Sequence, residues 1–159
     1  GALCDELAVS DSRIRVFHTP NGGVTAARSF GVAQACGEWI AFVDADDTLL
    51  PSALTVMLAK SAGCDVVIGN KQIVTRSGAT EEVMNTVDAQ LTPHDFLADL
   101  ITNRVSQFIT GRIFRRSLFE GGTVSIPRDL VMAEDFIMNV QLGEPLSRHH
   151  GFCLWLPCL

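Results

Sequence analysis

The stretch WIAFVDADD, residues 39–47, decides how this chain folds and indicates its chemistry. Its first five residues are mostly apolar and predict a buried strand, and three carboxylates follow within four positions. Clustered carboxylates repel one another and are costly to desolvate, so they are poorly suited to a core. They are well suited to a divalent cation, because hard cations prefer oxygen ligands and the ligand sites of open α/β sheets lie at the carboxyl ends of strands. The stretch therefore predicts metal-assisted chemistry on a phosphate-bearing substrate.

Strand-like and helix-like segments alternate on both sides of this stretch, which predicts an α/β fold with a partly parallel sheet. We expect strands at residues 13–18, 39–43, 65–70, 111–115 (strand or turn) and 152–156. We expect helices at residues 3–8, 24–35, 52–62, 92–103, 117–120 and 134–142. Residues 71–75 would continue the preceding strand, and residues 76–90 would form a loop or an edge hairpin.

Composition excludes several classes of protein. The chain has 159 residues, 47% of them hydrophobic, which fits a single domain with a substantial core. Its net charge of −6 argues against a nucleic-acid partner. No apolar run reaches the length of a transmembrane segment, and no secretory signal is visible. Five cysteines without metal-ligand spacing predict reduced, mostly buried thiols of a cytosolic protein.

The acidic run admits two interpretations. Asp44 and Asp46 are two positions apart, so on an extended strand their side chains would share one face and grip one Mg²⁺ or Mn²⁺ ion. In the alternative, the run is a solvated turn in which Asp47 or Thr48 caps the helix that begins near Pro51.

Two further segments carry candidate site residues. The loop Asn21-Gly22-Gly23 precedes a helix that contains Arg28; its glycines would let backbone approach a ligand, and the arginine could pair with a phosphate. An ordinary turn and a surface arginine explain the same pattern. Glu134 and Asp135 open another helix, where acids often complement the helix dipole; alternatively, Asp135 is a general base facing the metal.

A small basic group could meet an anionic acceptor or a donor phosphate, although a solvated face is the commoner explanation. It comprises Arg112, Arg115 and Arg116. The four histidines lack metal-ligand spacing and are interpreted as structural or solvated.

Taken in order, these segments resemble family 2 glycosyltransferases, which have the GT-A fold: a Rossmann-like mixed sheet flanked by helices that binds nucleotide-diphospho-sugars. The resemblance runs from about residue 4 to residue 142. Its strongest block joins Arg13-Ile14-Arg15-Val16, Asn21 to Arg28, Gly31 and residues 35–47 in one register. Two weaker blocks are Gly111 to Arg116 and Ala133-Glu134-Asp135-Phe136.

The resemblance implies transfer of a sugar from a nucleotide-sugar donor to a hydroxyl of a glycan or lipid-linked acceptor, with inversion at the anomeric carbon. It implies that Asp46 is the main ligand of a Mn²⁺ or Mg²⁺ ion, with Asp44 near the ribose or the metal and Asp47 beside them. Arg28 and the loop 21–23 would line the donor site. Asp135 would take the acceptor proton, supported by Glu134. Polysaccharide or surface-glycan synthesis, in the cytoplasm or peripherally at the inner membrane face, is the family-level expectation.

The chain departs from the family pattern at its start. It lacks the Pro-x-aromatic-Asn strand and the Asp-rich turn with which family members begin, and Gly1 follows no methionine. We therefore expect one partial glycosyltransferase-like domain over residues 1–159, an N-terminally truncated piece with little or no activity alone. Residues 144–159 match no family block.

Two rival functions remain. Residues Asp44 to Thr48 also fit the Asp-x-Asp-x-Thr signature of haloacid-dehalogenase-like phosphatases, with Asp44 as nucleophile and Asp46 as acid/base. A non-catalytic remnant that only binds a nucleotide or a partner is the other.

Overall fold

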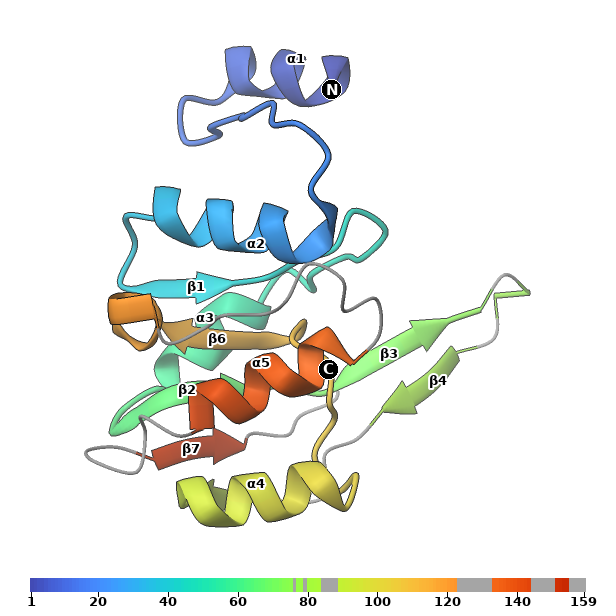
Figure 1. The fold of residues 1–159 in the computed structure, drawn as a ribbon. Helices are drawn as coiled ribbons and strands as arrows, with labels where there is room; N and C mark the ends of the chain where they lie inside the picture. Colours follow the sequence, from blue (N-terminus) through green and yellow to red (C-terminus); the bar gives the residue numbers. More distant parts are fainter. Residues whose placement is uncertain (76, 79, 84–88, 123–132, 144–150, 155–159) are drawn as a thin grey trace.

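The fold is a mixed sheet with helices on both faces, shown by a computed structural model in Figure 1. The structure describes residues 1–75, 77–78, 80–83, 89–122, 133–143 and 151–154. The five strands of the main sheet lie in the order β1 (Trp39–Ala41), β6 (Arg112–Arg115), β2 (Cys64–Ile68), β7 (Gly151–Leu154) and β5 (Ala89–Leu91). Only β2 and β7 pair in parallel; the other three neighbouring pairs are antiparallel. The predicted α/β class with a partly parallel sheet is confirmed.

The remaining elements surround this sheet. A separate antiparallel hairpin pairs β3 (Lys71–Val74) with β4 (Thr80–Val83), and Figure 1 shows it projecting away from the main sheet. The helices are α1 (Ala2–Ser10), α2 (Gly23–Gln34), α3 (Ala53–Ala59), α4 (Pro93–Ile101), the 3₁₀ helix η1 (Arg116–Gly122) and α5 (Glu134–Gly143).

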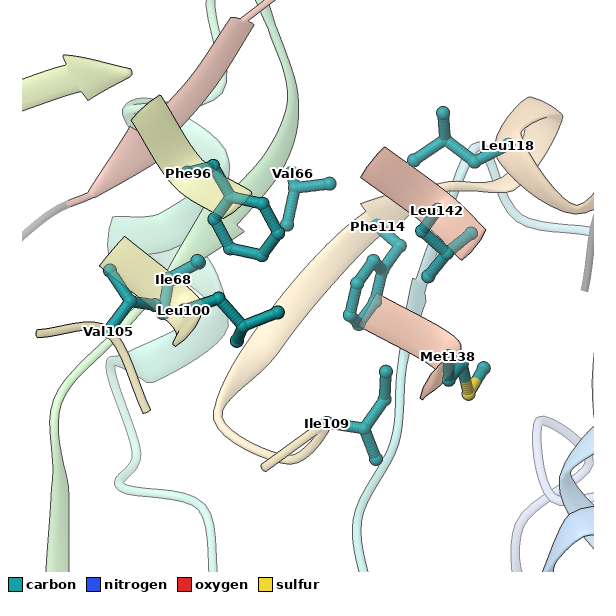
Figure 2. Packing of buried hydrophobic residues seen from close by; sticks show 10 residues of the cluster. All are labelled: Val66, Ile68, Phe96, Leu100, Val105, Ile109, Phe114, Leu118, Met138 and Leu142. Atoms are coloured by element: carbon teal, nitrogen blue, oxygen red, sulfur yellow. The ribbon is translucent and has the colours of Figure 1, made fainter. Parts of the chain in front are cut away.

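The main core lies between the sheet and helices α4 and α5 (Figure 2). Val66 and Ile68 of β2 and Phe114 of β6 point to this face, because alternate residues of a strand share a side. Phe96 and Leu100 of α4 pack on them, together with Met138 and Leu142 of α5 and three residues of the intervening segments: Val105, Ile109 and Leu118.

A second cluster lies on the opposite face of the sheet, under α3. Met57 of α3 packs there with Val67 of β2 and Ile113 of β6, the neighbours in sequence of the residues that face α4 and α5. Cys64 joins this second cluster although it is an even number of positions from Val66, because the register with β7 shifts between these two residues.

Local sequence signals explain where the helices begin. Thr92 caps α4: its hydroxyl oxygen accepts the backbone N–H of Asp95 at 3.2 Å, and Pro93 occupies the first helical position. Gly23 opens α2 with φ +81°, a conformation that favours glycine, and its N–H is accepted by the Asn21 side chain at 3.1 Å.

The predicted elements are largely confirmed, with three differences. Residues 13–18 form no strand, although their polar–apolar alternation suggested one. Residues 71–75 do not continue β2: the chain leaves the main sheet after Ile68 and enters the separate β3–β4 hairpin. Within residues 76–90, expected to be a loop or an edge hairpin, β4 is one arm of a hairpin, but β5 joins the edge of the main sheet beside β7. β7 confirms the expected last strand and begins one residue earlier than predicted.

The cysteine expectation is only partly met. Cys4 and Cys36 are free, as expected, but they are exposed rather than buried. Cys64 is buried, as expected, but it is disulfide-bonded rather than reduced. None of the helices in the described ranges has both the length and the apolar character needed to cross a bilayer.

Candidate active site

The candidate site lies where β1 and β2 end and β6 begins. β6 runs antiparallel to both neighbours, with Ala41 opposite Ile113 and Ile68 opposite Arg112. The backbone N–H of Gly69 donates to the carbonyl oxygen of Gly111 at 2.9 Å, which extends this alignment by one step. Residues that follow β1, follow β2 and precede β6 therefore meet at one edge of the sheet, the edge at which such folds bind ligands.

Arg28 of α2 connects the predicted site residues. Its Nη1 donates to Oδ1 of Asp135 at 2.5 Å, and its Nη2 donates to Oδ1 of Asp44 at 3.2 Å. The Arg28 side chain is only 12% exposed, and those of Asp135 and Asp44 are 19% and 47% exposed. Three predicted site residues, from α2, from the turn after β1 and from α5, thus form one charge-paired group. A surface arginine, the alternative explanation for Arg28, is excluded by its burial.

Asp135 is held from several sides. Its second carboxylate oxygen, Oδ2, accepts the backbone N–H of Ile109 at 3.0 Å. The Asn139 side chain, one turn further along α5, donates to the backbone carbonyl of Asp135 at 2.8 Å and to that of Gln107 at 2.9 Å. Asp135 is therefore more than an acid complementing the helix dipole: its carboxylate has a fixed position relative to α2 and to the segment before β6.

Arg112 anchors this arrangement from within the core. It is 2% exposed, its Nη1 donates to Oδ1 of Asn139 at 2.5 Å, and its Nη2 donates to the backbone carbonyl of Ser106. Its Nε has no hydrogen-bond partner among the described residues. Burial lowers the pKa of Arg112 to about 9, and the negative charge of Asp135 opposes this shift, so the guanidinium is still cationic at pH 7.

Lys71 is a second cation at the same edge. Its Nζ donates to Oγ1 of Thr110 at 2.8 Å and lies 4.3 Å from the ring centroid of Phe108. Burial lowers the pKa of Lys71 to about 8, and the positive charge of Arg112 acts in the same direction. Three carboxylates oppose the shift: those of Asp47, Asp135 and Asp44. The acidic run and Asp135 therefore act electrostatically on this ammonium group.

The acidic run forms a turn. β1 ends at Ala41, and the N–H of Asp47 donates to the carbonyl oxygen of Asp44 at 3.0 Å. The expectation that Asp44 and Asp46 share a strand face is therefore wrong, because the extended conformation has ended before them. Within the described ranges no group of three or more His, Cys, Asp or Glu side chains is close enough to hold a metal. The exposed carboxylates of Asp46 and Asp47 nevertheless fit a Mg²⁺-type ion, which needs only one or two protein carboxylates beside phosphate oxygens and water.

Two cavities meet at Arg28. One, of about 540 Å³, lies between α2 and residues 39–45 and includes Asp44 in its lining. The other, of about 180 Å³, lies between α2 and the start of α5 and includes Glu134. Glu134 thus lies beside Arg28, whereas the loop 21–23 lines neither cavity and lies at the start of the helix, more than one turn before Arg28.

The remaining basic residues are structural. Arg115 donates to Asp65 at 2.9 Å and to Glu38 at 2.6 Å, and it stacks over Trp39. Arg116 donates to the carbonyl oxygen of Gly37 at 3.0 Å. The solvated-face interpretation is wrong for Arg112, which is buried, whereas the side chains of Arg115 and Arg116 are 33% and 42% exposed and pair with nearby carboxylates.

Sequence reasoning missed three contributors to the site and gave a fourth, Arg112, a different role. The Ile109 N–H carries no sequence signal, since every non-proline residue has one. Asn139 stands one turn after Asp135, a spacing that places both on one face of α5. Arg112 is the first residue of β6 and Lys71 the first residue of β3, so the position of charged residues at strand starts is the signal that was available.

Comparison with known proteins identifies the family of this chain. The family profile described as glycosyl transferase family 2 matches residues 1–122. This range includes the acidic run, on which the phosphatase alternative also depended. The putative glycosyltransferase EpsH of Bacillus subtilis is 32% identical over 130 residues, covering 79% of this chain and 37% of that protein. The uncharacterized glycosyltransferase EpsJ of the same organism is 31% identical over 155 residues, 93% of this chain and 45% of its own length.

A third relative is the succinoglycan biosynthesis protein ExoO of Rhizobium meliloti, which is 29% identical over 82% of this chain and 40% of its own length. The chain therefore spans less than half the length of these curated relatives.

Proposed function

This chain belongs to glycosyltransferase family 2 and has the GT-A fold of that family, and we propose that its protein transfers a sugar from a nucleotide-sugar donor to a hydroxyl group of a glycan or lipid-linked acceptor. We further propose that the reaction inverts the anomeric carbon and serves polysaccharide or surface-glycan synthesis at the cytoplasmic face of a membrane. The names of EpsH and ExoO agree with transfer and with polysaccharide synthesis in those proteins. In this proposal residues 1–159 are part of one glycosyltransferase domain.

The main support for the proposal is that Arg28 forms ion pairs with both Asp135 and Asp44. An inverting transfer needs a base on one side of the anomeric carbon and cationic groups around the departing diphosphate on the other. Asp135 and Asp44 are 107 and 16 positions from Arg28 in the sequence, yet both accept hydrogen bonds from its guanidinium. This arrangement supplies both requirements at one edge of the sheet.

Asp135 is the proposed base. Each oxygen of an ionised carboxylate can accept two hydrogen bonds, so the bonds from Arg28 and from the Ile109 N–H leave each oxygen with acceptor capacity. An acceptor hydroxyl can donate there. As its oxygen forms the new bond to the anomeric carbon, its proton passes to Asp135, and the bond from that carbon to the donor phosphate breaks with its electron pair leaving on the nucleoside diphosphate.

Arg28 is the proposed contact for the donor diphosphate. Its guanidinium has five N–H donors in a planar fork, and the described contacts to Asp135 and Asp44 engage its two Nη atoms. It borders both cavities, so a diphosphate entering either one meets its positive charge. Glu134 borders the smaller cavity and supports the orientation of the α5 N-terminus in this proposal.

The family commonly uses divalent metals. We propose that Asp46 and Asp47 would hold a Mn²⁺ or Mg²⁺ ion together with the donor diphosphate, with Asp44 at the ribose or the metal. Such an ion neutralises charge that develops on the leaving diphosphate. The loop Asn21-Gly22-Gly23 completes the proposed donor site at the N-terminus of α2, where backbone N–H groups favour an anion.

The test is the release of nucleoside diphosphate. The intact protein is incubated with Mn²⁺, a panel of UDP-, GDP- and dTDP-sugars and an acceptor extract, and nucleoside diphosphate is quantified. We expect release from at least one donor, and we expect Asp135→Asn to lower it about 10²- to 10⁴-fold, the contribution typical of a general base. Asp11→Asn, which changes an acid of the exposed segment before α2, is the matched control and should leave the rate unchanged. No release from any donor, or equal rates in the two variants, would refute the proposal.

A further inference from the structure

The segment that leads into β6 presents two different surfaces. Ile109 is fully buried in the main core, while its neighbour Phe108 is 54% exposed. Phe108 and Thr110 are two positions apart, and both contact the ammonium group of Lys71. Between them, the backbone N–H of Ile109 donates to the proposed base Asp135. An exposed aromatic ring and an oriented ammonium group therefore stand directly beside the base, and the proposed donor chemistry uses neither.

The structure fixes Lys71 in this place. Gly111 has φ +73°, and a Cβ atom there would lie 2.9 Å from Cε of Lys71. The absence of a side chain at position 111 thus makes room for the lysine stem. Thr110, which is 7% exposed, engages one of the three ammonium donors at 2.8 Å. The lysine is held by packing and by a hydrogen bond, so its position beside Phe108 and Asp135 is a built feature of this edge.

We propose that Phe108 and Lys71 form the acceptor subsite and that its ligand is the pyranose ring of a glycan, whose hydroxyl group is presented to Asp135. This inference rests on the proposed function, because it identifies the substrate class on the acceptor side of the same site. The exposed ring of Phe108 matches the apolar C–H surface of a pyranose, since aromatic faces carry negative partial charge that attracts polarised C–H groups. The ammonium group of Lys71 is a donor for the oxygens at the rim of that sugar.

Charge favours a neutral sugar over a phosphate at this position. The carboxylates of Asp44, Asp47 and Asp135 act on Lys71, but so does the positive charge of Arg112. Arg28 pairs with two of the three carboxylates, so three cations balance three anions around this position. A ligand beside Phe108 therefore meets no net positive charge that would favour an anion, whereas hydroxyl groups would find both donors and acceptors. The acceptor subsite therefore selects for hydroxyl-rich rings, and any pyrophosphate of a lipid-linked acceptor lies away from it.

Binding of simple glycosides to the intact protein tests this subsite directly. The probes are the methyl glycosides of glucose, galactose and N-acetylglucosamine, with inorganic pyrophosphate as the anionic probe, and affinity is followed by NMR titration. We expect at least one glycoside to bind, Phe108→Ala to weaken it about fivefold, in line with the loss of one aromatic contact, and Lys71→Met to weaken it as well. Lys71→Arg, which keeps a cationic donor, should retain binding better than Lys71→Met.

The matched control is Phe17→Ala, because Phe17 is 45% exposed but lies in the segment between α1 and α2. It should leave glycoside binding unchanged. The inference is overturned if no glycoside binds, if Phe17→Ala weakens binding as much as Phe108→Ala, or if pyrophosphate binds and Lys71→Met abolishes that binding. Nucleoside diphosphate release by the wild-type protein reports separately on the proposed function. If the wild-type protein releases nucleoside diphosphate but Phe108→Ala binds glycosides as well as the wild type, only the acceptor subsite is refuted.

Discussion

Helices α1 and α2 differ sharply in packing from helices α4 and α5. Neither α1 nor α2 contains a buried residue. In α4 the buried residues are Phe96, Asp99 and Leu100, and in α5 they are Met138, Asn139, Leu142 and Gly143. Figure 1 shows the same contrast in arrangement: α5 lies against the sheet, whereas α1 stands apart at the end of a linking segment. Burial of apolar surface holds the second pair of helices to the sheet and contributes little to the first.

The candidate site joins these two regions through charge. Arg28 comes from the sparsely packed region and Asp135 from the densely packed one, and their ion pair is largely sheltered from solvent, with side chains 12% and 19% exposed. A sheltered pair is screened less than a surface pair, so it can position α2 where apolar contacts do not. Asp135 is therefore fixed by the core, while Arg28 depends on Asp135 for its own position.

A matched pair of leucine truncations gives the largest expected difference between the regions. Leu100 of α4 is fully buried and Leu7 of α1 is 47% exposed. Leu100→Ala should lower the free energy of unfolding by about 2–5 kcal/mol, because it removes buried methyl groups and leaves a cavity. Leu7→Ala should change it by less than about 0.5 kcal/mol, as expected for a surface position. Denaturant unfolding followed by circular dichroism measures both, and similar losses in the two variants would contradict the contrast in packing.

Arg28→Lys tests the link between the regions. A lysine keeps the charge but lacks the planar fork, so one ammonium group cannot hold Asp135 and Asp44 in the same geometry. We expect the rate of nucleoside diphosphate release to fall about 10- to 100-fold. This corresponds to an increase of about 1.4–2.8 kcal/mol in the activation free energy, as expected from the loss of one charge-assisted contact. Arg13→Lys is the control, because Arg13 also pairs with an aspartate but its side chain is 89% exposed. Equal activity of Arg28→Lys and wild type would show that the fork has no role.

The fold could be predicted well wherever local signals and burial agree. The cap and proline at Thr92 and Pro93 placed α4 correctly, and the apolar run before Asp44 placed β1. Residues 13–18 show the limit of such signals, because alternation states which side of a segment is apolar but not whether a partner strand lies beside it. The separate β3–β4 hairpin has the same cause: the sequence after Ile68 continues to look extended, and only tertiary pairing decides which sheet it joins.

The sequence was sufficient to predict several residues of the site, but not the contacts between them. Arg28, Asp44 and Asp135 were recognised as candidates, and their ion pairing required the structure. The roles of Arg112 and Lys71 were hidden, because a charged residue at the end of a strand reads as solvated unless its burial is known. Arg112 is nearly fully buried and bonded to Asn139, which no property of its own segment indicates. Contacts between distant elements, rather than residue types, are what sequence patterns leave out.

The smallest expected effect is a pH dependence of stability that arises in the densely packed edge. The pKa of Lys71 is lowered to about 8 in the folded protein from its ordinary value of 10.5, chiefly by burial. Between these values the unfolded chain binds more protons at this position than the folded one, so stability must rise with pH in that window. Because the side chain is only partly buried and solvent screens it, the rise should be on the order of 1 kcal/mol.

Comparison with Lys71→Met isolates this contribution from all other titrations. The free energy of unfolding is measured for both proteins at intervals from pH 7 to pH 10.5, and the variant is subtracted from the wild type at each pH. The difference should move in favour of the wild type from pH 8 upwards and level off near pH 10.5. A wild-type minus variant difference in unfolding free energy that is flat, or that falls as pH rises, would show that Lys71 is solvated and does not pack beside Asp135. The exposed ring of Phe108 would then lack its cationic neighbour.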